Sequence, residues 1–189
     1  VKINRFAATT YEEMMEKVNF LQQAGMQKLI LDLRGNPGGY LHIANQMCDE
    51  FLKDGELIVF TEGRNRPKQE TFATKNGQLE NIKVIVLIDE GSASASEIVS
   101  GALQDNDRGK IIGRRSFGKG LVQEQIPLKD GSVIRLTTQR YYTPSGRCIQ
   151  KDYGENEKDY YFEQYTRKVT TSQPDSLTYT TKNGRTVYG

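Results

Sequence analysis

The sequence predicts an α/β domain, and three observations support this fold class. Segments with strand-like hydrophobicity alternate along the chain with segments of helical periodicity. Two short apolar runs, LILDL at residues 29–33 and VIVLI at residues 84–88, are typical of buried strands. Each run ends in a turn rich in small residues, and a helical pattern follows.

The composition favours one globular unit and excludes several function classes. A chain of 189 residues can bury one core of useful size, which predicts a single domain. Its 26 basic and 24 acidic residues are interspersed, so nothing indicates a nucleic-acid or membrane surface. The two cysteines, Cys48 and Cys148, are too few for a disulfide scaffold, and no Cys/His cluster is present to hold a metal. We interpret them as ordinary thiols, and a bridge between them stays open.

The first elements are a strand, a helix and a buried strand. Residues 1–6 alternate like a short strand. Thr10 and its threonine neighbour offer a helix N-cap, and Gly25 supplies a stop for the helix that follows. The apolar run at 29–33 then ends in GNPGG at residues 35–39, which predicts an irregular turn.

The middle of the chain continues the alternation. Residues 40–52 have helical periodicity, and residues 56–61 are strand-like. A polar stretch then predicts an excursion around a short strand at Phe72. The run at 84–88 is the strongest buried-strand signal, and a serine- and alanine-rich turn leads from it into a helix at 97–103.

The last third is dominated by extended segments. Residues 110–113 form a short predicted strand, and residues 122–127 and 132–142 are joined by Lys-Asp-Gly at 129–131, which predicts a β-hairpin. Beyond the hairpin, prolines, glycines and charged residues break the pattern, although residues 160–168 favour a helix.

Ser94 is a candidate nucleophile because it lies between a buried strand and a helix, flanked by alanines that leave its hydroxyl accessible. A helix N-terminus presents free backbone N–H groups, which would stabilise an oxyanion that forms beside this serine. An alternative needs no catalysis, because Ser94 and Glu97 also fit the S-x-x-E capping box. The segment alone favours the capping interpretation.

A serine nucleophile needs a base, and the chain offers two candidates. His42 is the only histidine, and the G-x-S-x-G context that often accompanies a Ser-His-Asp triad is missing. Lys119 lies between Gly118 and Gly120, where the backbone can fold closely around it. A lysine base must be neutral, so we expect its amine to be desolvated. A solvated loop lysine is the ordinary alternative.

Two other motifs overlap Lys119. Residues 113–119 match G-x-x-x-x-G-K, but Gly120 stands where a phosphate-binding loop has Ser or Thr, and a strand is predicted where that loop needs a helix. Residues 116–119 match S-x-x-K, yet two glycines discourage the helical turn that this motif requires. Both patterns are therefore interpreted as coincidental.

Three segments together resemble the C-terminal processing, or tail-specific, peptidases of the S41 serine peptidase family. They are DLRGNPGG at residues 32–39, GSASASEI at 91–98 and SFGKGLVQ at 116–123. In that family the second serine of the S-A-S-A-S run is the nucleophile, which corresponds to Ser94. The resemblance also implies that Lys119 is the general base of a Ser-Lys dyad.

The same resemblance assigns the supporting residues. Gln123, four residues after the lysine, would hold the neutral amine by a hydrogen bond, and Gly120 would have to bend the chain to bring it close. The oxyanion hole would use the backbone N–H of Ala95 and of Gly38 or Gly39 in the glycine turn. Asp105 matches an acidic position of the family, for which support of a helix end is as plausible as a catalytic role.

The implied fold is a crotonase- and Clp-protease-like β-β-α spiral, with residues 1–150 as the peptidase core and residues 151–189 as a partly irregular C-terminal extension of the same domain. The family usually carries a PDZ domain, which we do not find in this chain. The resemblance implies protein or peptide substrates, no cofactor, no metal and no nucleic acid, and it leaves a homo-oligomer open. Family members act in the periplasm, the bacterial envelope or other extracytoplasmic compartments.

The function expected from the resemblance is that of a serine endopeptidase, which cleaves proteins near their C-termini through an acyl-enzyme. A non-catalytic binding domain on the same fold is the main alternative, because a fold does not fix a function. Acyl-CoA chemistry, which crotonase relatives perform, is a further alternative.

Overall fold

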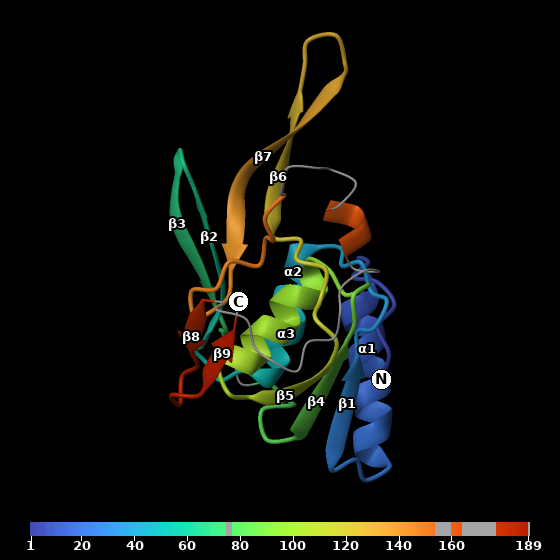
Figure 1. Cartoon of the computed structure of the whole chain (residues 1–189). Coiled ribbons are helices and arrows are strands. Elements are labelled where there is room, and N and C mark those ends of the chain that lie inside the picture. The colour runs from blue at the N-terminus through green and yellow to red at the C-terminus, as the bar shows by residue number, and fades with distance from the viewer. Residues whose placement is uncertain (75–76, 154–159, 164–176, 189) are drawn as a thin grey trace.

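The structure is a computed structural model that describes residues 1–74, 77–153, 160–163 and 177–188 (Figure 1). The first half of the chain contains α1 (Thr10–Gln23), β1 (Lys28–Asp32), α2 (Leu41–Phe51), β2 (Leu57–Gly63), β3 (Arg66–Phe72) and β4 (Lys83–Ile88). The second half contains α3 (Ala95–Asp105), β5 (Gly109–Gly113), β6 (Leu121–Pro127), β7 (Val133–Tyr142), β8 (Thr178–Thr180) and β9 (Thr186–Tyr188).

Between residues 10 and 142, each predicted helix and strand is present, with its ends shifted by a few residues. Residues 1–6 differ from the prediction, because they form only isolated parallel bridges, Lys2 to Asp32 and Phe6 to Gly39. The predicted helix at 160–168 is helical at residues 160–163, and its remainder lies outside the described residues. The β8–β9 hairpin was not predicted.

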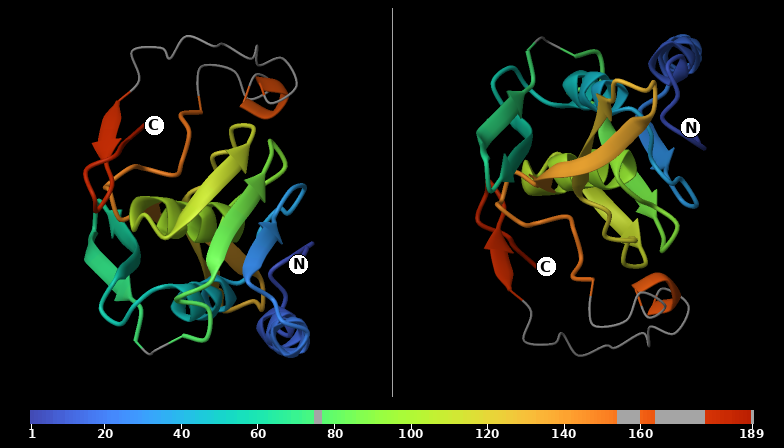
Figure 2. Two further views of the ribbon diagram at one scale, coloured as in Figure 1. Left: turned by 90° about the horizontal axis from the view of Figure 1, so that it is seen from below. Right: turned by 90° about the horizontal axis from the view of Figure 1, so that it is seen from above.

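A parallel sheet of three strands, in the order β1-β4-β5, positions the site. Its register pairs Lys28 with Lys83 and Val84 with Gly109. Figure 2 shows the three strands side by side, with α3 behind them. Because the strands are parallel, their carboxyl ends lie at one edge of the sheet. The segments that follow β1, β4 and β5 therefore all leave the sheet at the same edge.

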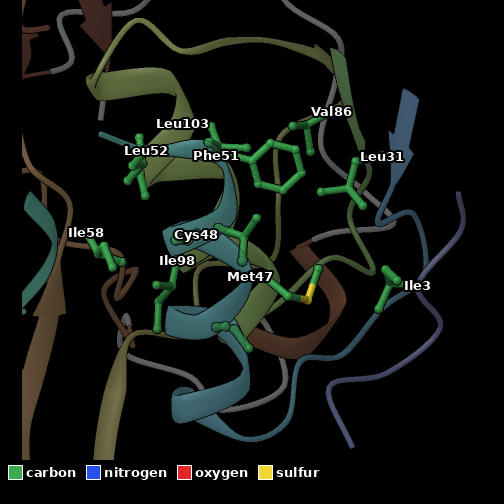
Figure 3. Close-up of a cluster of buried hydrophobic side chains, with 14 of the residues drawn as sticks. Ile3, Leu31, Met47, Cys48, Phe51, Leu52, Ile58, Val86, Ile98 and Leu103 are labelled. Carbon is green, nitrogen blue, oxygen red and sulfur yellow. The ribbon is translucent and has the colours of Figure 1, made fainter. Parts of the chain in front are cut away.

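The hydrophobic core lies between this sheet and helices α2 and α3. Leu31 and Val86 project from the sheet toward Phe51 and Leu103 of the two helices, and Ile58 contributes from β2 (Figure 3). All five side chains are buried, and complete burial of such a side chain stabilises the fold by about 1.5–3 kcal/mol. The core fixes the direction in which α3 starts, and with it the position of Ser94.

A second, antiparallel sheet has the strand order β3-β2-β7-β6. Only the last part of β7 pairs with β2, where Phe60, Thr61 and Glu62 face residues 140–142. The remainder of β7 pairs with β6 alone, and this hairpin projects away from the body of the molecule (Figure 1). The predicted hairpin is thus confirmed as an arm that begins beside the loop of Lys119.

Two further predictions concern the state of the two cysteines and the character of the helices. Cys48 is buried in α2, Cys148 is partly exposed, and both are free, which confirms their interpretation as ordinary thiols. Burial raises the pKa of the Cys48 thiol. Within the described residues, no helix combines the length and apolar character that crossing a bilayer requires.

Candidate active site

Three motif segments meet at the carboxyl edge of the parallel sheet. Residues 33–40 follow β1, residues 89–94 follow β4, and residues 114–120 follow β5. These are the segments that carry the glycine turn, Ser94 and Lys119. Ligand sites of open α/β sheets form at this edge, because only loops and helix N-termini lie there. The fold therefore brings together three motifs that are far apart in the sequence.

Ser94 is distinguished from its neighbouring serines by exposure and bonding. The hydroxyl of Ser92 donates to the carbonyl of Leu33 at 2.8 Å, and that of Ser96 donates to the carbonyl of Asn36 at 3.0 Å. Both are fully buried, whereas Ser94 is partly exposed. Of the three serines in this turn, Ser94 is therefore the one that solvent or a ligand can reach.

The backbone of Ser94 is strained. Its φ is 56° and its ψ is −111°, a region that residues other than glycine rarely adopt. Such a conformation costs on the order of 1–3 kcal/mol and persists only where the surroundings hold it in place. A sharp strand-to-helix turn with a strained serine is also how α/β-hydrolases present a nucleophile. The strain is an independent indication that this position has a function.

Asn36 holds the glycine turn against the serine turn. It is fully buried, its Nδ2 donates to the carbonyl of Ile3 at 2.8 Å, and its Oδ1 accepts from the N–H of Gly38 at 2.9 Å. Its own carbonyl accepts from the N–H of Ala93 at 3.0 Å. One satisfied amide therefore joins the N-terminal segment, the glycine turn and the residues before Ser94.

Gly38 lies directly against the start of α3. It has φ +95°, and a Cβ at this position would lie 2.6 Å from the carbonyl oxygen of Ala93 and 2.9 Å from the nitrogen of Ala95. Only glycine allows this approach. The amide of Gly38 is already bonded to Asn36, whereas within the described part of the chain the amides of Gly39 and Ala95 have no hydrogen-bond acceptor.

Glu97 joins the serine turn to the loop of Lys119. Its carboxylate accepts four hydrogen bonds, from the N–H of Ser94 at 2.8 Å, the hydroxyl of Ser116 at 2.7 Å, the N–H of Gly118 at 2.6 Å and the N–H of Lys119 at 2.8 Å. Burial raises the pKa of Glu97, and the four donors oppose this shift. The predicted capping box of Ser94 and Glu97 is confirmed, and it coexists with the accessible position of the serine.

Lys119 lies close to Ser94 along the backbone, but its side chain differs from the prediction. The N–H groups of Lys119 and Ser94 donate to the same oxygen of Glu97. This shared acceptor holds the two backbones close together. Among the described residues, no hydrogen bond joins the lysine amine to the serine hydroxyl. The desolvated environment expected for Lys119 is absent, because its side chain is exposed.

The flanking glycines explain this difference. A Cβ at Gly118 would lie 2.9 Å from Cβ of Lys151, and one at Gly120 would lie 2.5 Å from the nitrogen of Gln150. The backbone is therefore tightly packed on both sides of Lys119, as the glycine pattern predicts. The packing surrounds the glycines, however, and leaves the lysine side chain in solvent.

Gln123 is an exposed residue of β6, and within the described chain it makes no hydrogen bond to Lys119. A register shift in the β6–β7 ladder lies between Val122 and Gln123, and such a shift redirects the side chains beside it. The bend expected at Gly120 stays a prediction. A role for Gln123 next to the lysine stays a prediction.

Asp105 stabilises a loop at the end of α3. It is buried, and its Oδ2 accepts from the hydroxyl of Ser145 at 2.7 Å and from the N–H of Ser145 at 3.2 Å. These contacts agree with the support of a helix end, which was one of its two expected roles. The other oxygen of Asp105 has no hydrogen-bond partner within the described residues, and Arg147 lies 3.8 Å from it.

The competing motifs lack the structure that they require. Lys119 and Gly120 lead into strand β6, so the G-x-x-x-x-G-K pattern has no following helix, and Ser116 and Lys119 do not lie on a helical turn. His42 is exposed on α2, with its ring 5.4 Å from that of Tyr40. None of the hydrogen bonds described for Ser94 involves this histidine.

An ion pair at the end of β1 was missed by sequence reasoning. Arg34 donates from Nε and Nη2 to the two oxygens of Asp32, at 2.9 and 2.8 Å. This bidentate contact lowers the pKa of Asp32 to about 2. Arg34 lies in the turn after the strand, so strand periodicity does not predict this pair, and the closeness of the two residues in the sequence is the signal that could have indicated it.

Together, a strained and accessible serine, unbonded amides beside it and a lysine whose backbone lies nearby are the kinds of group that acyl transfer uses. The chain belongs to peptidase family S41, whose profile matches residues 1–161. Its fold is the α/β catalytic fold of this family. It aligns with the photosystem II D1 C-terminal processing protease at a TM-score of 0.74 and 34% identity, over 79% of this chain and 38% of that one. The predicted family and fold are thereby confirmed.

Curated relatives agree with this assignment. The chain is 46% identical to a carboxy-terminal-processing protease of Bartonella bacilliformis over 155 residues, which are 79% of this chain and 36% of that protein. It is 38% identical to a carboxyl-terminal-processing protease of Synechocystis over 151 residues, which are 80% of this chain and 35% of the relative. The chain thus spans about a third of the length of these relatives. No PDZ domain is found among the residues that the structure describes.

Proposed function

We propose that this chain is the catalytic core of a serine endopeptidase in which Ser94 is the nucleophile and Lys119 the general base. The observation that carries the proposal is the carboxylate of Glu97, which binds the N–H groups of both residues and so holds their backbones together. The flexible stem of an exposed lysine can then turn toward the serine hydroxyl when a substrate covers the site and excludes water.

In the proposed reaction, the neutral amine of Lys119 takes the proton of the Ser94 hydroxyl while the serine oxygen attacks the carbonyl carbon of a peptide bond. The carbonyl oxygen becomes an oxyanion, which the amides of Ala95 and Gly39 stabilise. Gly38 leaves the space that this oxygen needs. Collapse of the intermediate breaks the C–N bond, and the lysine returns its proton to the leaving amine. Water then hydrolyses the acyl-enzyme by the same path, and Gln123 orients the lysine amine.

The substrates in this proposal are proteins or peptides cleaved near their C-termini, because the relatives are carboxy-terminal-processing proteases. An activity in the periplasm or envelope is part of the proposal, and the family resemblance supports it. The resemblance does not specify the natural substrates or whether the protein forms a homo-oligomer.

The decisive experiment is covalent labelling of the intact protein with a fluorophosphonate, which reacts with activated serines. We expect Ser94→Ala to abolish labelling and proteolysis, while Ser100→Ala, on the same helix, preserves both. Lys119→Arg is expected to be inactive although it keeps the charge, because arginine does not lose its proton in proteins. Labelling of Ser94→Ala at the rate of the unmodified protein would overturn the proposal.

A further inference from the structure

Strand β6 has a free edge that begins at the proposed active site. The strand starts at Leu121, directly after Lys119 and Gly120, and is the last strand of its sheet. One edge pairs with β7, and no strand in the described part of the chain pairs with the other. A free edge presents unpaired N–H and C=O groups, which form a template for an added strand. The free edge of β6 therefore extends the proposed active site along the backbone of this strand.

The hydrogen-bond pattern of the hairpin shows which residues face this edge. At the tip, the N–H of Leu128 donates to the carbonyl of Ser132 at 2.8 Å. In an antiparallel ladder, residue pairs that bond to each other alternate with pairs whose N–H and C=O groups point outward. Counting back from Leu128 in steps of two, the backbone groups of Ile126 and Glu124 therefore bond to β7. The backbone groups of the residues between them, Pro127, Gln125 and Gln123, point outward.

Pro127 limits the usable length of the edge. It stands at an outward position, opposite Val133, where it offers no N–H group. Proline is a common means of blocking a strand edge against unwanted pairing. Here it blocks only the end near the tip, whereas within the described part of the chain no strand pairs with the outer side of Gln123 and Gln125. The residues with complete outward backbone groups are Gln123 and Gln125, immediately after the register shift at Val122.

We propose that the substrate binds as an additional β-strand on this edge, paired with the backbone of Gln123 and Gln125. The ligand is an extended polypeptide segment, recognised by its main chain and independent of its side chains at these positions. The inference rests on the proposed function. It adds that the strand following the base aligns the peptide, and that a substrate must be unfolded over the residues next to the cleaved bond.

The opposite edge of the hairpin provides an internal control. Among the described residues, no strand pairs with residues 133–137 of β7 on their outer side, because β2 pairs only with residues 140–142. That edge leads along β7 to the β2 side of the sheet, away from Lys119. Arg135 faces Gln125 across the ladder, so the two residues occupy equivalent outward positions on opposite edges.

The first test uses peptide substrates N-methylated at one backbone nitrogen at a time, with the unmodified protein. Pairing with an edge uses alternate residues, so we expect kcat/KM to fall at every second position on one side of the cleaved bond. Loss of one hydrogen bond predicts a decrease of about threefold to tenfold. A scan without this alternation overturns the inference. Failure of the unmodified protein to react with a fluorophosphonate would instead contradict the proposed function.

The second test compares Gln125→Pro with Arg135→Pro. Both remove an outward N–H at an equivalent position, so they change the fold to a similar degree, which circular dichroism can verify. For each variant, kcat/KM on a long peptide is divided by the rate of fluorophosphonate labelling. We expect this ratio to fall about threefold to tenfold in Gln125→Pro and to stay at the unmodified value in Arg135→Pro. Equal ratios in the two variants would overturn the inference.

Discussion

Glu97 is the side chain on which the relative position of Ser94 and Lys119 depends. Its carboxylate receives three backbone donors and one hydroxyl, and a buried donor that loses its acceptor costs about 1–3 kcal/mol. We expect Glu97→Gln to lower kcat at least about tenfold and Glu97→Ala to lower it further, because an amide nitrogen cannot accept these bonds. Steady-state kinetics checks this. Glu13→Gln, at an exposed position of α1, is the control, and equal kcat for Glu97→Gln and the control would contradict the role.

The ion pair of Asp32 predicts how the stability of the folded protein depends on pH. Arg34 lowers the pKa of this carboxyl from 3.8 to about 2, so the ion pair stabilises the folded state above the unfolded pKa. The contribution is lost as the pH falls from 3.8 toward about 2, because the carboxyl becomes protonated. We expect Arg34→Gln to lower stability by about 1 kcal/mol or less at pH 7, since the arginine is largely exposed. Urea unfolding from pH 7 to pH 3 measures whether the difference between the two proteins shrinks. A constant difference would contradict this account.

At the scale of elements, the glycine turn before α2 has two positions with different requirements. Gly38 and Gly35 both have positive φ, but a Cβ at Gly38 would clash with the residues around Ser94, whereas one at Gly35 meets nothing within 4 Å. We expect Gly38→Ala to abolish fluorophosphonate labelling. Gly35→Ala should retain it, with only the cost of about 1–2 kcal/mol of a left-handed alanine. Similar labelling of the two variants would show that close approach at Gly38 is unimportant.

The helices and strands were largely predictable, because hydrophobic periodicity reports which face of an element is buried. The glycine turn and the serine turn were predicted as candidate parts of one site through the family resemblance. The contact of Glu97 with Gly118 and Lys119 was not predictable, because its donors are backbone N–H groups. Every residue except proline has such a group, so the sequence does not indicate which ones bind Glu97. The exposure of Lys119 was missed for a related reason: glycines indicate a tightly packed backbone but do not say where the side chain between them points.

At the scale of the whole molecule, one core supports both sheets and the start of α3. Phe51 is fully buried in that core, whereas Phe20 is 66% exposed. We expect Phe51→Ala to lower the free energy of unfolding by about 3–5 kcal/mol, and Phe20→Ala to change it by about 0.5 kcal/mol or less. Chemical denaturation measures both. A similar loss in the two variants would place the main core elsewhere.

The parallel sheet also has an opposite end, where β1, β4 and β5 begin. The connections that enter the sheet there lie a full strand length from the segments that carry Ser94, Lys119 and the glycine turn. Gly25, between α1 and β1, has open space around it. A fluorophore, an immobilisation tag or a short peptide insert attached at this turn would therefore report on the protein, or anchor it, without disturbing its chemistry.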